Sequence, residues 1–224
     1  MNKAPALRTV LLVLAVTIAA LAGRENILSR FIENRETARG AGENRPDILG
    51  PSPYDVAEKA VGKKLEGPYP FFDQDGKPFD LAAWFDKPMV ISYIFTECPM
   101  VCPTISQSLA DFVKSGFVTL GAHYRIVTVG FDPANDKPAA MKAFGGKFTS
   151  DFSSWRFVSG SPEVVKRLSE DIGIMYMPDD QGAWKHTMGV TILAAGGKVS
   201  SQLSGMAIET PDLLAKLKEA GAGK

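Results

Sequence analysis

Residues 89–103 read MVISYIFTECPMVCP and join two structural signals in one stretch. The first seven residues form an apolar run rich in β-branched and aromatic residues, which is typical of a strand buried on both faces. The last six hold both cysteines of the chain, Cys98 and Cys102, and Pro103 is typical of the first turn of a helix. The stretch therefore predicts a central strand, a turn that carries two thiols, and a helix from Pro103 to about Gly116.

The rest of the chain alternates strand and helix signals in the order of an α/β protein. The further predicted elements are a hairpin at 70–81 with Asp75-Gly76 in its turn, strands at 124–131 and 155–158, helices at 138–148, from Pro162 and from Thr210, and a hairpin made of 189–194 and 198–203. We expect an α/β fold with a central mixed sheet flanked by helices and an N-terminal hairpin extension. A dithiol that follows the first central strand and opens a helix is a thioredoxin-like arrangement, and open α/β sheets bind ligands at this end of their strands.

The composition is that of a globular protein without a charge bias. The 224 residues are 45% hydrophobic and 22% charged, which allows one domain of ordinary size and an extension. The 25 basic and 25 acidic residues cancel, so charge gives no reason to expect binding to nucleic acid.

The N-terminal residues have the plan of an export signal. Lys3 and Arg8 precede an almost unbroken apolar stretch at 10–22. This stretch is shorter than the roughly 20 apolar residues that span a bilayer, and Ala20-Leu21-Ala22 fits a cleavage site. Residues 1–23 are therefore either a cleaved signal peptide or a retained membrane anchor. Both alternatives put the folded domain outside the cytoplasm, and we expect it in the periplasm, either free or anchored to the inner membrane.

A tether is expected between this segment and the folded domain. Residues 24–64 have mixed charge, several Gly and Pro and little apolar periodicity, with a short helix predicted at 26–36. The folded domain is expected to comprise residues 65–224.

The dithiol has three candidate uses. A structural disulfide between Cys98 and Cys102 would close a very short loop, which constrains the unfolded chain little. A redox pair is favoured by the helix N-terminus, which stabilises a thiolate, although thioredoxin-like oxidoreductases have C-x-x-C and this chain has C-x-x-x-C. A metal site is the third use, because two thiolates suit Cu(I) and an imidazole suits copper in either oxidation state.

A metal site needs a third ligand, and the chain has two histidines. His123 precedes the second buried strand, so it is expected at the strand end away from the dithiol, in a surface or structural role. His186 lies in a predicted loop that enters the strand at 189–194. In a thioredoxin-like sheet this loop faces the dithiol, so His186 is the candidate third ligand.

Three segments together resemble the Sco/SenC copper chaperones. They are TECPMVCPT at 96–104, TVGFDPANDKP at 128–138, and His186. That family has a CPxxCP loop, a DPxxDxP segment and a distant His in this order, and the resemblance covers roughly residue 65 to the C-terminus. It implies a thioredoxin-like fold, one copper ion bound by Cys98, Cys102 and His186, and delivery of copper to the CuA site of cytochrome c oxidase.

Two departures from the family pattern are visible. The family often has Asp directly before the His and an acidic turn in the final hairpin, whereas this chain has Lys185 and Ala195-Gly196-Gly197. Lys185 puts a cation beside the proposed ligand, which bears on tuning and partner docking more than on ligand identity.

Other residues near these motifs have weaker signals. Asp132 is expected either to cap the turn that follows it or to orient the C-x-x-x-C loop. Met100, Met175, Met177 and Met188 are soft sulfur donors, for which assistance in copper transfer is one expected role and gap-filling or partner-surface contact the favoured ones.

The leading hypothesis is an extracytoplasmic copper metallochaperone, a binding protein rather than an enzyme, whose disulfide formation would abolish copper binding. Its partners would be the CuA-bearing subunit of cytochrome c oxidase, other copper chaperones or thiol reductants, and the membrane if the N-terminal segment is retained. The first alternative is a thiol–disulfide oxidoreductase that reduces the cysteines of a target copper site. The second is a copper or redox sensor.

Overall fold

The computed structural model describes residues 59–178 and 184–223. The predictions for the export signal and for most of the tether lie outside the described residues. Within the described ranges, no helix is both long and apolar enough to cross a membrane.

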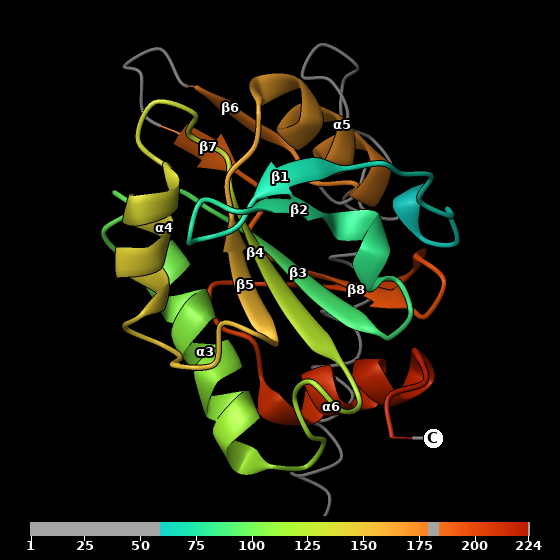
Figure 1. Cartoon of the computed structure of the whole chain (residues 1–224). Helices are drawn as coiled ribbons and strands as arrows, with labels where there is room; N and C mark the ends of the chain where they lie inside the picture. The colour runs from blue at the N-terminus through green and yellow to red at the C-terminus, as the bar shows by residue number, and fades with distance from the viewer. Residues whose placement is uncertain (1–58, 179–183, 224) are drawn as a thin grey trace, which may run out of the picture. The chain divides into compact units, whose positions relative to one another are not determined.

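The described elements alternate between strand and helix in the predicted order (Figure 1). In chain order they are β1 (Pro70–Phe72), β2 (Pro78–Asp80), the 3-10 helix η2 (Leu81–Trp84), β3 (Met89–Ile94), α3 (Val101–Ser115), β4 (Arg125–Gly130), α4 (Pro138–Gly145), β5 (Trp155–Val158), α5 (Pro162–Ile172), β6 (Tyr176–Pro178), β7 (Trp184–His186), β8 (Gly189–Ala194), β9 (Lys198–Ser204) and α6 (Thr210–Glu219).

A five-stranded mixed sheet with the strand order β5-β4-β3-β8-β9 forms the centre of the domain. β4 runs parallel to β3 and β5, whereas β8 runs antiparallel to β3 and β9. All six residues of β3 are buried, as expected from its apolar run. The predicted α/β, thioredoxin-like class with a central mixed sheet is therefore confirmed.

Each face of the sheet has its own apolar core, because successive side chains of a strand point to opposite faces. Val90 and Ile94 of β3 pack with residues of α3, α4 and α6. Met89 and Ile91 pack instead with the β1–β2 hairpin and α5. The domain thus has three layers, with the hairpin crossing one face of the sheet (Figure 1).

Helix α3 begins two residues earlier than predicted. The N–H of Thr104 donates to the carbonyl of Met100 at 3.1 Å, so the first turn closes at Val101 instead of Pro103. Proline is tolerated in this first turn because its missing N–H would have no partner in the helix. As a result Cys102 lies inside the first turn of α3.

The antiparallel pair β6–β7 was not predicted, since residues 184–188 were expected to be a loop. Each strand has only three residues, which is too short for an alternating pattern to show in the sequence. Tyr176 pairs with His186, and Pro178 pairs with Trp184. This pairing fixes the backbone position of His186, the candidate third ligand.

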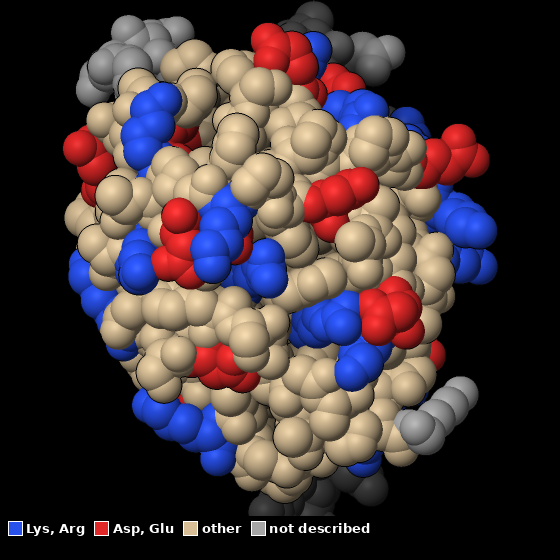
Figure 2. Space-filling model, viewed as in Figure 1, with Lys and Arg blue, Asp and Glu red and all other residues tan. Residues whose placement is uncertain are grey.

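Charged side chains of both signs are interspersed on the face of the domain shown in Figure 2. This distribution agrees with a net charge of zero. The described part of this face therefore contributes little long-range steering of charged partners.

Candidate metal centre

The dithiol lies at the carboxyl end of β3, where the chain turns into α3. The N–H of Cys98 donates to the carbonyl of Phe95 at 3.1 Å, which closes a turn directly after the strand. Cys102 follows in the first turn of the helix. The sequence prediction of a dithiol between a buried strand and a helix N-terminus is confirmed.

The two thiols have unequal surroundings. Cys98 is half-buried, whereas Cys102 is fully buried, and both are free cysteines. The backbone N–H of Cys102 donates to Sγ of Cys98 at 3.3 Å. Burial, which is the main cause, together with the contact with Cys98 raises the pKa of the Cys102 thiol. Burial thus favours the protonated form of the Cys102 thiol in the metal-free protein.

His186 ends β7 with its ring against two phenylalanines. The ring centroid lies 5.1 Å from that of Phe131 and 6.1 Å from that of Phe95, the latter nearly perpendicular. Nδ1 lies 2.9 Å from the carbonyl oxygen of Thr187, and because a carbonyl only accepts, Nδ1 carries the proton. Nε2 is then left with a lone pair. Burial lowers the pKa of His186, which favours the neutral, metal-binding imidazole.

His186 and the dithiol lie at one edge of the sheet. Val190 of β8 pairs with Ser92 of β3 in antiparallel register, so the residues before β8 extend beside the residues that follow β3. Nevertheless, no group of three or more His, Cys, Asp and Glu side chains in the described ranges is close enough together to hold a metal ion. The structure thus brings the three candidates to the same edge without assembling them into one ligand set.

Asp136 is a residue of this edge that the sequence reasoning did not single out. Its Oδ1 accepts from the backbone N–H of Thr96 at 2.7 Å and from the Thr96 hydroxyl at 2.8 Å, and its Oδ2 accepts from the N–H of Asp132 at 2.8 Å. Burial raises the pKa of Asp136 in spite of these hydrogen bonds. Its signal in the sequence was the second Asp of the DPANDKP segment, four residues after Asp132.

Asp132 has the turn-capping role that was one of its two expected roles. Its carboxylate accepts from the N–H of Ala134 at 3.1 Å and from the side chain of Asn135 at 2.9 Å. Burial alone would raise the pKa of Asp132, but hydrogen bonds from Asn135, Ala134 and Trp184 outweigh it and lower the pKa. The segment that leads to the dithiol is instead hydrogen-bonded to Asp136, through the backbone and the hydroxyl of Thr96.

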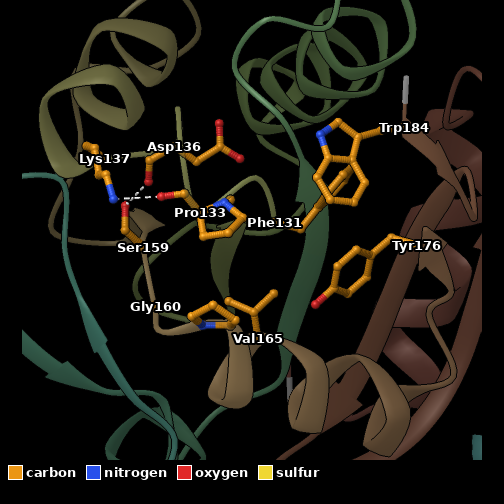
Figure 3. A pocket seen from close by; sticks show the side chains of 11 residues that line it. Phe131, Pro133, Asp136, Lys137, Ser159, Gly160, Val165, Tyr176 and Trp184 are labelled. Atoms are coloured by element: carbon orange, nitrogen blue, oxygen red, sulfur yellow. Dashed lines mark hydrogen bonds between the residues drawn. The ribbon is translucent and has the colours of Figure 1, made fainter. Parts of the chain in front are cut away.

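A pocket of about 160 Å³ is lined in part by the ring of Phe131. Phe131, Tyr176 and Trp184 form its aromatic side, and Lys137 and Ser159 lie across from them (Figure 3). Lys137 donates to the carbonyl of Pro133. Phe131 therefore lines the pocket and also contacts the imidazole of His186.

The methionines singled out in the sequence are mostly exposed. The exposed fractions are 62% for Met100, 53% for Met177 and 41% for Met188, while Met175 is half-buried. Met206 is also exposed, and the N–H of the preceding Gly205 donates to the carbonyl of Met188 at 3.1 Å. Exposure excludes the gap-filling role for Met100, Met177 and Met188 and leaves partner contact or assistance in copper transfer as their expected roles.

His123 and Lys185 lie apart from the candidate ligands. His123 is exposed before β4, and its Nδ1 accepts from the N–H of Thr119 at 3.0 Å, which agrees with the expected structural role. Lys185 is exposed and sits between the half-buried Trp184 and His186 of β7. Because successive side chains of a strand point to opposite faces, Lys185 projects away from the face that carries His186.

Comparisons with known proteins place this architecture in a family. The "SCO1 protein homolog" of Bacillus subtilis is 27% identical over 162 residues, which cover 70% of this chain and 83% of that protein. The crystal structure of a SCO1/SenC family lipoprotein from Bacillus anthracis has a TM-score of 0.63 and 29% identity, and the match covers 71% of this chain and 96% of that one. Arabidopsis thaliana ScoI with copper bound has a TM-score of 0.58 and 21% identity over 68% of this chain and 96% of that one, which shows a shared fold. The sequence model of SCO1/SenC matches residues 57–221, and the chain therefore belongs to the SCO1/SenC family.

Proposed function

We propose that this protein is an extracytoplasmic copper metallochaperone. Cys98, Cys102 and His186 take one copper ion and pass it to the CuA-bearing subunit of cytochrome c oxidase. The observation that carries the proposal is that His186, whose Nδ1 faces a backbone carbonyl so that the lone pair lies on Nε2, is at the same sheet edge as the only two thiols of the chain. The family relationship and the copper in Arabidopsis thaliana ScoI support copper as the cargo.

The donor set suits copper as a cargo in transit. Two thiolates favour Cu(I), and the imidazole adds a ligand that Cu(II) also accepts. Binding must displace the protons of the thiols, including that of the buried Cys102, so it is expected to strengthen as the pH rises. A set of three ligands leaves room for a ligand of the recipient, so the ion can move by exchange of one ligand at a time.

The exposed methionines support a protein recipient at this edge. Met100 follows Cys98 by two residues, and Met188 follows His186 by two. Flexible thioether side chains adapt to many partner surfaces. We further propose that the protein works in the periplasm, with the N-terminal segment as export signal or anchor.

X-ray absorption and metal stoichiometry of the reduced protein test the proposal. One copper per chain with two sulfur ligands and one nitrogen ligand is expected, and His186→Ala should lose the nitrogen and most of the Cu(II) affinity. His123→Ala is the matched control and should keep both. A reduced protein that binds no copper, or binds it equally well without His186, would rule the proposal out.

A second candidate function is thiol–disulfide exchange with the cysteines of a target copper site. The hydrogen bond from the Cys102 N–H to Sγ of the more exposed Cys98 favours it, since attacking and resolving thiols differ in accessibility. In this case His186→Ala leaves both target reduction and respiratory phenotype nearly unchanged. A chaperone instead loses copper delivery in that variant while disulfide exchange persists.

A further inference from the structure

The carboxylate of Asp136 joins the ends of two neighbouring strands. It accepts two hydrogen bonds from Thr96, which follows β3, and one from Asp132, which follows β4. Only 3% of Asp136 is exposed. Hydrogen bonds to a buried carboxylate are short and stronger than those between neutral groups, so this junction resists displacement.

The junction fixes two aromatic rings. Phe95 directly precedes Thr96, and Phe131 directly precedes Asp132. The N–H of Phe131 donates to the carbonyl of Ile94 at 3.0 Å, and the two ring centroids are 5.5 Å apart. The backbone on the C-terminal side of each ring is therefore tied to the same carboxylate.

These two rings support His186, which lies against both of them. The turn that carries the dithiol also starts at Phe95, because the N–H of Cys98 donates to the carbonyl of Phe95. One carboxylate is thus hydrogen-bonded to the residue that follows each of the two rings, and in the described ranges it makes no hydrogen bond to the three candidate ligands.

We propose that Asp136 is a positioning residue, which holds Phe95 and Phe131 as the seat of His186 and so sets the place of the imidazole relative to Cys98 and Cys102. The functional meaning of this inference rests on the proposed copper site. Its structural content concerns the metal-free protein and is tested there first.

The first experiment measures the His186 ring signals by NMR in the reduced, metal-free protein. Thr96→Val removes the hydroxyl donor to Asp136 but keeps the backbone donor, and Asp136→Asn changes the acceptor itself. Because ring currents of Phe95 and Phe131 act on the imidazole, both variants should shift its proton signals. Thr104→Val is the matched control, since the Thr104 hydroxyl donates to the carbonyl of Met100 at 2.8 Å and not to Asp136.

Equal His186 signals in the folded wild type, Thr96→Val and Thr104→Val would overturn the inference. Thr96→Val keeps two of the three hydrogen bonds, so it decides the matter even where Asp136→Asn does not fold. This readout needs no metal, so it is independent of the proposed function.

The second experiment is a double-mutant cycle on Cu(II) affinity. Thr96→Val is expected to weaken binding about tenfold, the effect of one hydrogen bond to a charged group. The same substitution should have no further effect in the His186→Ala background, because the position of the imidazole no longer matters there. Additive losses would show that Asp136 acts by another route. Absence of copper binding in the wild type would refute the proposed function and leave the NMR result to stand alone.

Discussion

The backbone N–H of Cys102 and Sγ of Cys98 are joined by a hydrogen bond of 3.3 Å across the first turn of α3. The hydrogen bond holds the Cys98 sulfur at the start of the helix, whereas the Cys102 sulfur is buried in the core. The two thiols of one short motif are therefore chemically distinct before any metal or partner arrives.

Alkylation should distinguish them. Cys98 is expected to react first with iodoacetamide near neutral pH, because Cys102 is fully buried and burial raises its pKa. Mass spectrometry of peptides after brief labelling measures the site. Denatured protein, in which both thiols should react, is the control, and faster labelling of Cys102 in the folded protein would contradict the assignment.

The stability of the metal-free protein should depend on pH through His186. Burial lowers the folded-state pKa below the ordinary value of 6.5, so the unfolded chain binds the proton more tightly. The free energy of unfolding is then expected to fall as the pH drops through 6.5 toward the folded-state pKa. Above pH 6.5 the neutral His186 should make its full contribution to stability.

Urea unfolding of the reduced protein between about pH 5 and pH 8 measures this slope. His186→Gln should flatten it, and His123→Gln should leave the contribution of His186 in place. A slope that is the same in wild type and His186→Gln would contradict the prediction.

Gly130→Ala should disturb the junction at Asp136. A Cβ at Gly130 would lie 2.6 Å from Cβ of Asp136 and 2.9 Å from Sδ of Met141, both buried. Overpacking of this kind should reduce the free energy of unfolding by about 2 kcal/mol. Denaturant melts measure it, with Gly146→Ala as the control, where the nearest atom is 3.3 Å away. Equal stability of the two variants would show that the end of β4 can shift to make room for the methyl group at no cost in stability.

Lys185→Asp restores the residue type that often precedes the His in the family. Lys185 is exposed and projects away from His186, so we expect Cu(II) affinity to change less than about threefold, the range of screened surface charges. Competition titration at two salt concentrations measures it beside His186→Ala. A change of tenfold or more that disappears at high salt would place the cation within reach of the metal.

The sequence predicted the central sheet because each core strand carries its own signal. The apolar run of β3, the second run of β4 and the Ser161-Pro162 helix start all depend on local residue types. The dithiol position follows from them, since a strand end and a helix start meet there.

The parts that were missed depend on contacts between distant segments. β6 and β7 are held by pairing with each other, and Asp136 gains its role only when Thr96, 40 residues earlier, comes to lie beside it. A buried carboxylate has no periodic pattern that sets it apart from an ordinary turn residue. The turn-capping role of Asp132 was foreseeable because its partners are two and three residues away.

The two halves of the candidate centre also differ in local stability. Cys98 and Cys102 follow a strand that is buried along its whole length, whereas His186 sits on a separate two-stranded sheet of three-residue strands that are mostly exposed or half-exposed. Amide hydrogen exchange should thus be slow in β3 and fast in β7, because local opening of a short strand pair needs much less free energy than opening of a central sheet. If copper binds as proposed, detachment of the imidazole alone would open one position on the ion to a ligand of the recipient, while both thiolates still hold the ion and the dithiol half of the domain stays folded.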